Sequence, residues 1–211
     1  TDKAVNPVNL YGATKLVAEK IFTQGNAYSA RGGTAICCVR YGNVIGSRGS
    51  IVPLFHAQRA TGKVTVTDAR MTRFWISLEE GVQLVLRAIE DMRGGEILVP
   101  KIPSMRIMDL AEAVAPECTV DFVGIRPGEK LHEVMCPKDD SHLTLEFESH
   151  YTIKPSFTFE DSTIDYSKTM INEKGKSVSH GFEYNSETNP IFLDIEQIKT
   201  INNLVLKNQN T

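Results

Sequence analysis

The stretch Thr1-Asp2-Lys3-Ala-Val-Asn-Pro-Val-Asn-Leu-Tyr11-Gly-Ala-Thr-Lys15 organises the rest of this chain. Tyr11 and Lys15 are four residues apart, a spacing that places both side chains on one face of a helix. A free tyrosine is a poor base at neutral pH. Because a neighbouring ammonium favours the phenolate, the pair can take a proton from a hydroxyl group. The same spacing is also typical of an ordinary helix face that carries an aromatic residue and a lysine.

The composition is that of a globular protein. Hydrophobic residues make up 41% of the chain and the net charge is -3, which leaves no basic footprint for nucleic acid. No apolar run approaches the roughly 20 residues that span a bilayer, so we expect no membrane segment. The sequence has four cysteines and no Cys-x-x-Cys pair, which favours a reduced, cytoplasmic setting.

Strand and helix patterns alternate along the chain, which predicts an α/β fold. Residues 34–41 form a nearly continuous apolar run, typical of a central parallel strand. The patterns predict further strands at about 64–68, 96–99, 119–123 and 143–153. They predict helices at about 10–28, 51–61, 77–91, 108–114 and 190–206. Two of these helices carry residues at helical spacing, Leu16, Val17, Lys20 and Ile21 in the first and the apolar stripe Val82, Val85, Leu86 and Ile89 in the third.

Polar residues follow the first predicted strand in the segment Gly-Asn43-Val-Ile-Gly-Ser-Arg48-Gly-Ser50. Ligands of open α/β sheets bind outside the carboxyl ends of strands, so this loop is a candidate ligand site. Asn43 offers a donor and acceptors, and Arg48 offers a fork for phosphate. An ordinary strand-to-helix loop with a solvated arginine is the simpler alternative.

Two later segments offer further ligand candidates. Arg73 could pair with a phosphate or with Asp68. In the segment Arg126-Pro-Gly-Glu129, the turn presents an arginine that suits a diphosphate and a carboxylate that suits ribose hydroxyls. A surface turn with compensating charges would look the same. The neighbouring His132-Glu sequence lacks the second histidine of a zinc motif, so we expect no metal site.

These motifs together resemble the extended short-chain dehydrogenase/reductases. Within that family they are similar to the UDP-N-acetylglucosamine 4,6-dehydratases of the inverting kind that opens pseudaminic acid synthesis in bacteria. The resemblance rests on residues 1–15, 40–50, 67–75 and 126–133. It implies the C-terminal part of an NAD(P)-binding Rossmann-like fold plus a small α/β substrate-binding domain. The glycine-rich turn of a dinucleotide site is missing near the start, so we expect about 120–130 residues of a cofactor half to precede Thr1.

The resemblance also implies a division of the chain by role. Residues 1–50 would complete the Rossmann domain with its catalytic helix, and residues 51–150 would mainly bind the UDP-sugar, with a returning Rossmann strand near 96–99. Residues 151–211 would form a C-terminal extension.

The family assigns chemistry to particular positions. Tyr11 would take the proton of the C4 hydroxyl, and Lys15 would lower the pKa of the tyrosine and hold the ribose of the cofactor. Asp2 would be the acid that protonates the leaving C6 hydroxyl, and Lys3 the base that exchanges the C5 proton. The residues implied to contact the cofactor are Thr1, Tyr11, Lys15 and Val44. Those implied to bind substrate are Asn43, Arg48, Ser50, Thr65, Thr67, Arg73, Arg126 and Glu129.

The implied cofactor is NADP, with NAD as the alternative, and the implied substrate is UDP-N-acetylglucosamine. Product would serve flagellin or surface-glycan synthesis, and the intact enzyme would be a homo-oligomer. Three alternatives stay open: a UDP-sugar 4-epimerase, a retaining dehydratase, and a fragment that only binds a UDP-sugar. The Asp2-Lys3 pair favours a dehydratase, because an epimerase needs no acid/base pair for elimination. It resembles the inverting kind, because retaining dehydratases usually have Asp-Glu at these two positions. We expect the 211-residue chain alone to be inactive.

Overall fold

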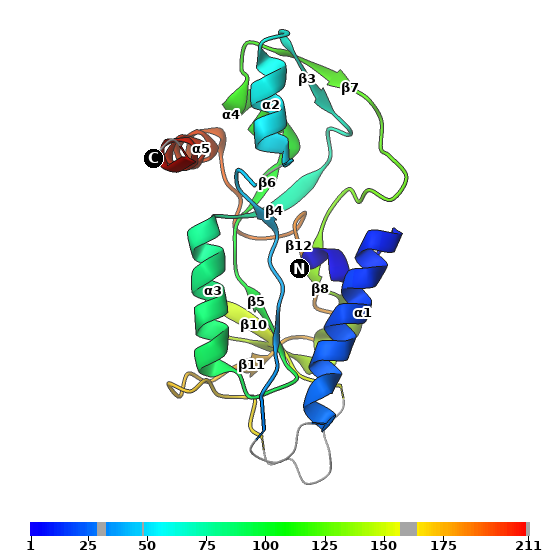
Figure 1. Cartoon of the computed structure of the whole chain (residues 1–211), viewed down its shortest axis with the longest axis vertical. Coiled ribbons are helices and arrows are strands. Elements are labelled where there is room, and N and C mark those ends of the chain that lie inside the picture. The colour runs from blue at the N-terminus through cyan, green and yellow to red at the C-terminus, as the bar shows by residue number, and fades with distance from the viewer. Residues whose placement is uncertain (29–32, 48, 157–163, 210–211) are drawn as a thin grey trace. The chain divides into compact units, whose positions relative to one another are not determined.

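The computed structural model describes residues 1–28, 33–47, 49–156 and 164–209. The chain forms two compact units (Figure 1). Unit 1 comprises residues 1–41, 80–101 and 134–185, and unit 2 comprises residues 42–79, 102–133 and 186–211. The division by role at residues 50 and 150 stays a prediction.

Unit 1 is built on a five-stranded sheet in the order β1-β5-β10-β9-β11. Its strands are β1 (Cys38–Val39), β5 (Ile97–Pro100), β9 (Thr144–Glu146), β10 (His150–Ile153) and β11 (Lys176–Ser177). As predicted for the first strand, β1 runs parallel to its neighbour β5, whereas β5, β10, β9 and β11 pair antiparallel. Figure 1 shows this sheet between the helices α1 (Leu10–Gly25) and α3 (Leu78–Asp91). The remaining elements of the unit are η1 (Asp2–Ala4), η2 (Asn26–Tyr28), η3 (Lys138–Leu143), β8 (Val134–Cys136) and β12 (Tyr184–Asn185).

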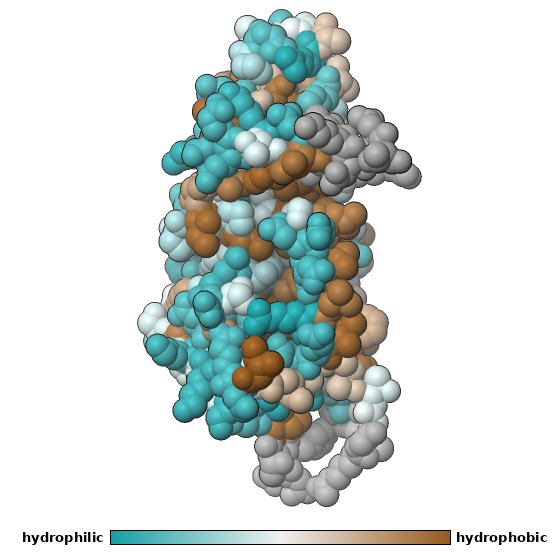
Figure 2. All heavy atoms as spheres, turned by 90° about the vertical axis from the view of Figure 1, so that its left-hand side faces the viewer, coloured by the Kyte–Doolittle hydropathy of each residue, from teal (hydrophilic) through white to brown (hydrophobic). Residues whose placement is uncertain are grey.

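Most of the apolar residues at helical spacing in α1 and α3 are exposed. In α1, Val17 and Ile21 are 58% and 63% exposed. In α3, Val82, Val85, Leu86 and Ile89 also lie on the surface. Figure 2 views the side on which α3 lies and shows hydrophobic atoms gathered there. The spacing identified one face of each helix correctly, but nothing in the described part of the chain covers it. Instead α1 turns Gly12 and Glu19 toward the unit interior.

Unit 2 packs three helices around short sheets. The parallel strands β3 (Lys63–Val66) and β7 (Thr119–Phe122) form one ladder, and β2 (Asn43–Val44), β4 (Thr72–Ile76) and β6 (Ser104–Arg106) form another sheet. The helices are α2 (Ile51–Arg59), α4 (Ile107–Val114) and α5 (Ile195–Gln209). Their apolar faces meet in one core whose fully buried members include Phe55, Val64, Val66, Leu110 and Ile198. This core supports the loops that follow β2, β3 and β7.

Three elements differ from the sequence expectation for local reasons. The expected strand 143–153 is a hairpin of β9 and β10, because the chain turns back after Phe147, whose amide donates to the carbonyl of His150. The first helix ends at Gly25 because Asn26 instead bonds both backbone groups of Ile36, at 2.5 and 2.8 Å. The last helix begins only at Ile195, after a reciprocal capping pair between Asp194 and Gln197.

The expected strand 34–41 appears as only the two residues of β1, and a separate strand β2 follows. Gly42 stands between them. A Cβ on Gly42 would lie 2.5 Å from the Cβ of Phe74, so only glycine lets the chain pass β4 this closely. After β1 the chain therefore passes close to β4 at Gly42 and does not continue as one longer strand.

Candidate active site

The turn η1 holds the predicted acid/base pair in direct contact. Lys3 Nζ lies 3.1 Å from each carboxylate oxygen of Asp2. The Asp2 side chain is only 3% exposed, whereas that of Lys3 is 36% exposed. The backbone of this turn bonds to the edge of β1 that faces away from β5. Thr1 N donates to Val39 O at 2.9 Å, and Asp2 N donates to Tyr41 O at 3.3 Å. A buried carboxylate thus stands beside an ammonium that reaches solvent.

Helix α1 presents the predicted tyrosine and lysine together. Asn9 caps its first turn by accepting from Gly12 N at 2.8 Å, which fixes where the helix begins. Lys15 Nζ lies 5.2 Å from the centre of the Tyr11 ring, so the expected pairing on one helix face is present. Tyr11 is 61% exposed, and its hydroxyl is open to a ligand rather than used in the core.

Gly12 joins these two parts of the site. A Cβ at this position would lie 2.8 Å from the carbonyl oxygen of Lys3 and 2.9 Å from Cβ of Pro7. The residue directly after Tyr11 therefore touches the backbone of the acid/base turn. This contact places the turn that carries Thr1, Asp2 and Lys3 against the start of the helix that carries Tyr11 and Lys15.

A buried ion pair lies two helical turns beyond Tyr11, and the sequence analysis missed it. Glu19 accepts from Arg40 Nε at 2.8 Å and from Arg40 Nη2 at 2.6 Å. Arg40 Nη1 also donates to Met135 O at 2.8 Å. One signal could have found the pair. An arginine at the end of an apolar strand needs a buried acid, and Glu19 continues the Tyr11–Lys15 spacing by one more turn.

The polar loop after β2 belongs to unit 2. Asn43 and Val44 form β2 and lie beside Trp75 and Ile76 of β4. The Asn43 Oδ1 and Ser50 Oγ atoms are buried, and neither has a hydrogen-bond partner among the described residues. Ser50 stands at the start of α2 without capping it through its side chain. Arg48, the third predicted ligand of this loop, lies outside the described residues.

The ladder of β3 and β7 brings two predicted groups to one edge. Because these strands are parallel, Thr67 after β3 and the loop after β7 that carries Arg126 and Glu129 leave from the same end. Thr65 Oγ1 accepts from Gln58 Nε2 at 2.8 Å, and Thr67 Oγ1 lies 3.2 Å from Met71 Sδ. Glu129 N donates to Arg126 O at 3.1 Å, which closes the expected turn.

Arg73 is bound to that same loop. Its Nη1 donates to Thr72 O at 2.7 Å and to Leu131 O at 2.9 Å, and its Nη2 donates to Lys130 O at 3.0 Å. The side chain is 15% exposed. Asp68, which the sequence offered as its partner, instead pairs with Arg70 at 2.8 Å. Arg73 therefore holds the segment that leads from Glu129 back to the core.

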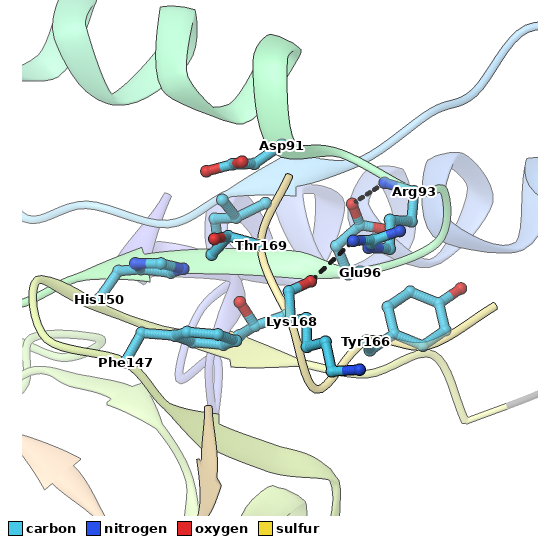
Figure 3. Close-up of a pocket in the computed structure, with 10 residues that line it drawn as sticks. Asp91, Arg93, Glu96, Phe147, His150, Tyr166, Lys168 and Thr169 are labelled. Atoms are coloured by element: carbon cyan, nitrogen blue, oxygen red, sulfur yellow. Dashed lines mark hydrogen bonds between the residues drawn. The ribbon is translucent and has the colours of Figure 1, made fainter. Parts of the chain in front are cut away.

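Unit 1 also contains a small cavity that none of the predicted site residues lines. Figure 3 shows it between the end of α3, the sheet and residues 166–169. Its volume is about 20 Å3, which is enough for roughly one water molecule. Glu96 accepts from the amides of Arg93 and Gly94 at 2.5 and 2.7 Å, and burial raises its pKa. These groups stabilise the turn after α3, and the space is too small for a sugar nucleotide.

The cysteine side chains of this chain are buried or half-buried. All four cysteines are free. Burial raises the pKa of Cys37 to about 11 and that of Cys136 to about 12, so both thiols stay protonated at neutral pH. Among the described residues, no group of three or more His, Cys, Asp or Glu side chains could hold a metal ion. In the same part of the chain, no helix is long and apolar enough to cross a membrane.

Known proteins resemble this chain over nearly its whole length. It is 52% identical over 205 residues to the UDP-N-acetylglucosamine 4,6-dehydratase (inverting) of Campylobacter jejuni, a match that covers 96% of this chain and 61% of the relative. It is 36% identical to the UDP-glucose 4-epimerase of Rickettsia akari, over 95% of this chain and 59% of the relative. The chain thus spans about three-fifths of the length of these relatives.

A solved structure shows the same fold. The X-ray structure of Pen from Bacillus thuringiensis superimposes with a TM-score of 0.78 at 31% identity, covering 99% of this chain and 61% of that one. This confirms the mixed α/β, Rossmann-like fold expected from the sequence. Residues 1–155 match the family described as polysaccharide biosynthesis protein. The chain therefore belongs to that family of extended short-chain dehydrogenase/reductases.

Proposed function

We propose that this chain carries the acid/base and substrate-binding part of a nucleotide-sugar 4,6-dehydratase that acts on UDP-N-acetylglucosamine. The observation that carries the proposal is the direct contact of Asp2 and Lys3 on a turn packed against the start of the Tyr11–Lys15 helix. Beyond the tyrosine that takes the C4 hydroxyl proton, an elimination needs a further acid and base, and an epimerisation at C4 does not. The Campylobacter jejuni relative carries the name of this reaction.

Tyr11 and Lys15 serve the oxidation at C4. Tyr11 Oη accepts the proton of the C4 hydroxyl, and the Lys15 ammonium beside its ring stabilises the phenolate. The exposure of Tyr11 leaves the hydroxyl within reach of a sugar. The resulting C4 ketone makes the C5 proton acidic, which prepares the loss of water.

Asp2 and Lys3 serve the elimination. A neutral Lys3 amine takes the proton from C5, the C6–O bond breaks, and a protonated Asp2 gives its proton to the leaving hydroxyl, which departs as water. The elimination step thus leaves Asp2 as carboxylate and Lys3 as ammonium, the ion pair seen at 3.1 Å. The Lys3 ammonium gives a proton back to C5 when the hydride returns to C6, and the proton that Tyr11 took from the C4 hydroxyl balances the one that Asp2 gave to the leaving water.

Residues of unit 2 bind the UDP-sugar. The buried Asn43 Oδ1 and Ser50 Oγ atoms are polar groups that a ligand hydroxyl would satisfy. Arg126 binds the diphosphate and Glu129 the ribose hydroxyls, both from the loop at the carboxyl end of β7. The remaining assigned positions are Arg48, Thr65, Thr67 and Arg73.

A nicotinamide cofactor would accept and return the hydride when bound, with NADP preferred over NAD. Tyr11, Lys15, Thr1 and Val44 would hold it. The chemistry of these groups fits, because a tyrosine hydroxyl, a lysine ammonium and a threonine hydroxyl are hydrogen-bonding partners for a ribose. A cofactor-binding part of the protein would cover the exposed apolar faces of α1 and α3. The active enzyme is a cytoplasmic homo-oligomer whose product, a UDP-4-keto-6-deoxy sugar, enters pseudaminic acid synthesis for flagellin or surface glycans.

The deciding experiment is product analysis. This chain replaces the matching region of the Campylobacter jejuni relative, and the chimera is incubated with UDP-N-acetylglucosamine and NADP+. We expect a product lighter by one water, and we expect Tyr11→Phe to lower kcat by about 10²–10⁴-fold. The 211-residue chain alone is the parallel sample, for which we expect no turnover.

Epimerisation is the second candidate, favoured by the 36% identity to the Rickettsia akari UDP-glucose 4-epimerase. It predicts a product of unchanged mass and an activity that survives Lys3→Met. An active chimera with that outcome would replace the dehydratase by the epimerase.

A further inference from the structure

We propose that Glu19 and Arg40 are positioning residues for the Tyr11–Lys15 pair. The inference rests on the proposed function, because it assigns the pair a role in that reaction. Neither residue touches a substrate. They act by setting the rotation of α1 and its distance from β1, and thus the place of Tyr11 and Lys15 relative to the acid/base turn.

The contacts join three elements at one point. Arg40 follows β1 and reaches Glu19 on α1 through two hydrogen bonds of 2.6 and 2.8 Å, with side-chain exposures of 3% and 5%. Its third donor reaches Met135 O in β8 at 2.8 Å. Arg40 N itself donates to Leu98 O of β5 at 2.9 Å, so the guanidinium starts from a fixed backbone. A planar fork on a carboxylate sets orientation as well as distance.

The pair lies where rotation of the helix matters most. Glu19 is one turn beyond Lys15 and two turns beyond Tyr11, near the same face of α1. The other end of that face is fixed by Gly12 against Lys3 O. Gly12 and Glu19 hold the part of α1 that carries Tyr11 and Lys15, and Asn26, which bonds both backbone groups of Ile36, holds the helix just past its C-terminal end. The exposed apolar stripe of α1 adds no further anchor within the described residues.

Stability alone gives a weak reason for this arrangement. A buried ion pair contributes little net stability, because desolvation of both charges offsets their attraction, and apolar residues of similar size often do as well. Geometry gives a stronger reason, because a displacement of about 1 Å in a catalytic group can cost about 10²-fold in rate. The pair is therefore expected to matter more for kcat than for folding.

The test compares four forms of the protein at its natural full length: wild type, Glu19→Gln, the double variant Glu19→Gln/Arg40→Met, and Val99→Ala. Val99 is fully buried in β5 and has no part in the site, so Val99→Ala destabilises unit 1 without touching the pair. The double variant removes the unpaired buried charge, so its Tm is expected to recover relative to Glu19→Gln. Its kcat is expected to stay about 10–100-fold below wild type with little change in KM.

Two outcomes would overturn the proposal. One is that kcat follows Tm across the four forms, so that the double variant recovers its rate and Val99→Ala loses as much as Glu19→Gln. The other is a large rise in KM at constant kcat, which would place the pair in binding.

A second readout separates this inference from the proposed function. Tyr11 is labelled by 3-fluorotyrosine and followed by ¹⁹F NMR, which needs no substrate. We expect its resonance to shift in Glu19→Gln and in the double variant, and to stay in place in Val99→Ala. If wild type does not release water from UDP-N-acetylglucosamine but the resonance moves as expected, the function fails and the positioning role stands. An unmoved resonance rejects the positioning role whatever the reaction.

Discussion

Gly12 faces the carbonyl oxygen of Lys3 so closely that a Cβ would lie 2.8 Å from it. This one contact sets how near the acid/base turn η1 comes to the helix that carries Tyr11. The carbonyl belongs to a backbone that is bonded on its other side to β1, so the turn cannot retreat freely. The absence of a side chain at Gly12 therefore sets the distance between the Asp2–Lys3 turn and the helix that carries Tyr11 and Lys15.

Gly12→Ala is expected to separate this turn from the helix. The added methyl group meets backbone and a proline ring, neither of which can move aside cheaply, so overpacking costs about 1–3 kcal/mol of stability. We expect kcat to fall about 10–100-fold, because Tyr11 and Lys3 would no longer both lie within reach of one bound sugar. Kinetics and thermal unfolding of the variant measure both effects. Gly81→Ala is the matched control, because a Cβ there meets nothing within 4 Å. Equal kinetics for the two variants would show that the contact is not needed.

If Lys3 is the base, the product formed in heavy water should carry solvent-derived deuterium at C5. The ammonium of Lys3 is 36% exposed, so its protons exchange with solvent between turnovers. In D2O the product should therefore carry deuterium at C5, as read by NMR of the sugar. Asp2→Asn should lower the rate of water loss while leaving deuterium exchange at C5 measurable, since it removes the acid and keeps the base. A product without deuterium at C5 would remove Lys3 from the base role.

Arg73→Lys is expected to weaken uridine binding as well as UDP binding. The guanidinium fork holds the carbonyls of Lys130 and Leu131, so its loss loosens the loop that carries Glu129. We expect about a tenfold rise in Kd for both ligands by calorimetry. A direct phosphate ligand would instead affect UDP and leave uridine unchanged. Arg70→Lys is the control, because Arg70 is exposed and pairs only locally with Asp68.

His150 predicts acid sensitivity of unit 1. Burial lowers the pKa of His150 to about 4, and its ring stacks on Phe147 with centroids 4.6 Å apart. The unfolded chain binds this proton near pH 6.5, so the folded state loses stability as pH falls from about 6.5 to about 4. The loss attributable to this group is on the order of 3 kcal/mol.

His150→Phe keeps the stack and removes the proton site, so its unfolding free energy should depend less on pH over that range. Urea denaturation followed by circular dichroism at several pH values measures the difference. His180→Gln, at an exposed position, should behave as wild type. An unchanged pH dependence in His150→Phe would assign the acid sensitivity to other groups.

The sequence by itself determined the elements and the residue types of the candidate site. Helical and strand periods depend on neighbours a few residues away, so α2, α3, α4, β3, β5 and β7 appear close to their expected positions. Tyr11 and Lys15 meet because a spacing of four is local to one helix turn. The contact between Asp2 and Lys3 is equally local, since they are neighbours on one turn.

Only the tertiary structure decided what each face and each charge meets. Period alone cannot tell a buried stripe from an exposed one, and in α1 the exposed face is the apolar one while Glu19 is buried. The partner of Arg40 lies 21 residues away and that of Arg73 lies 57 to 58 residues away, so no local pattern could assign them. Gly12 looked like an ordinary helix residue until the fold brought Lys3 O against it. Such contacts depend on how closely segments far apart in the sequence approach one another, and local sequence patterns do not specify those distances.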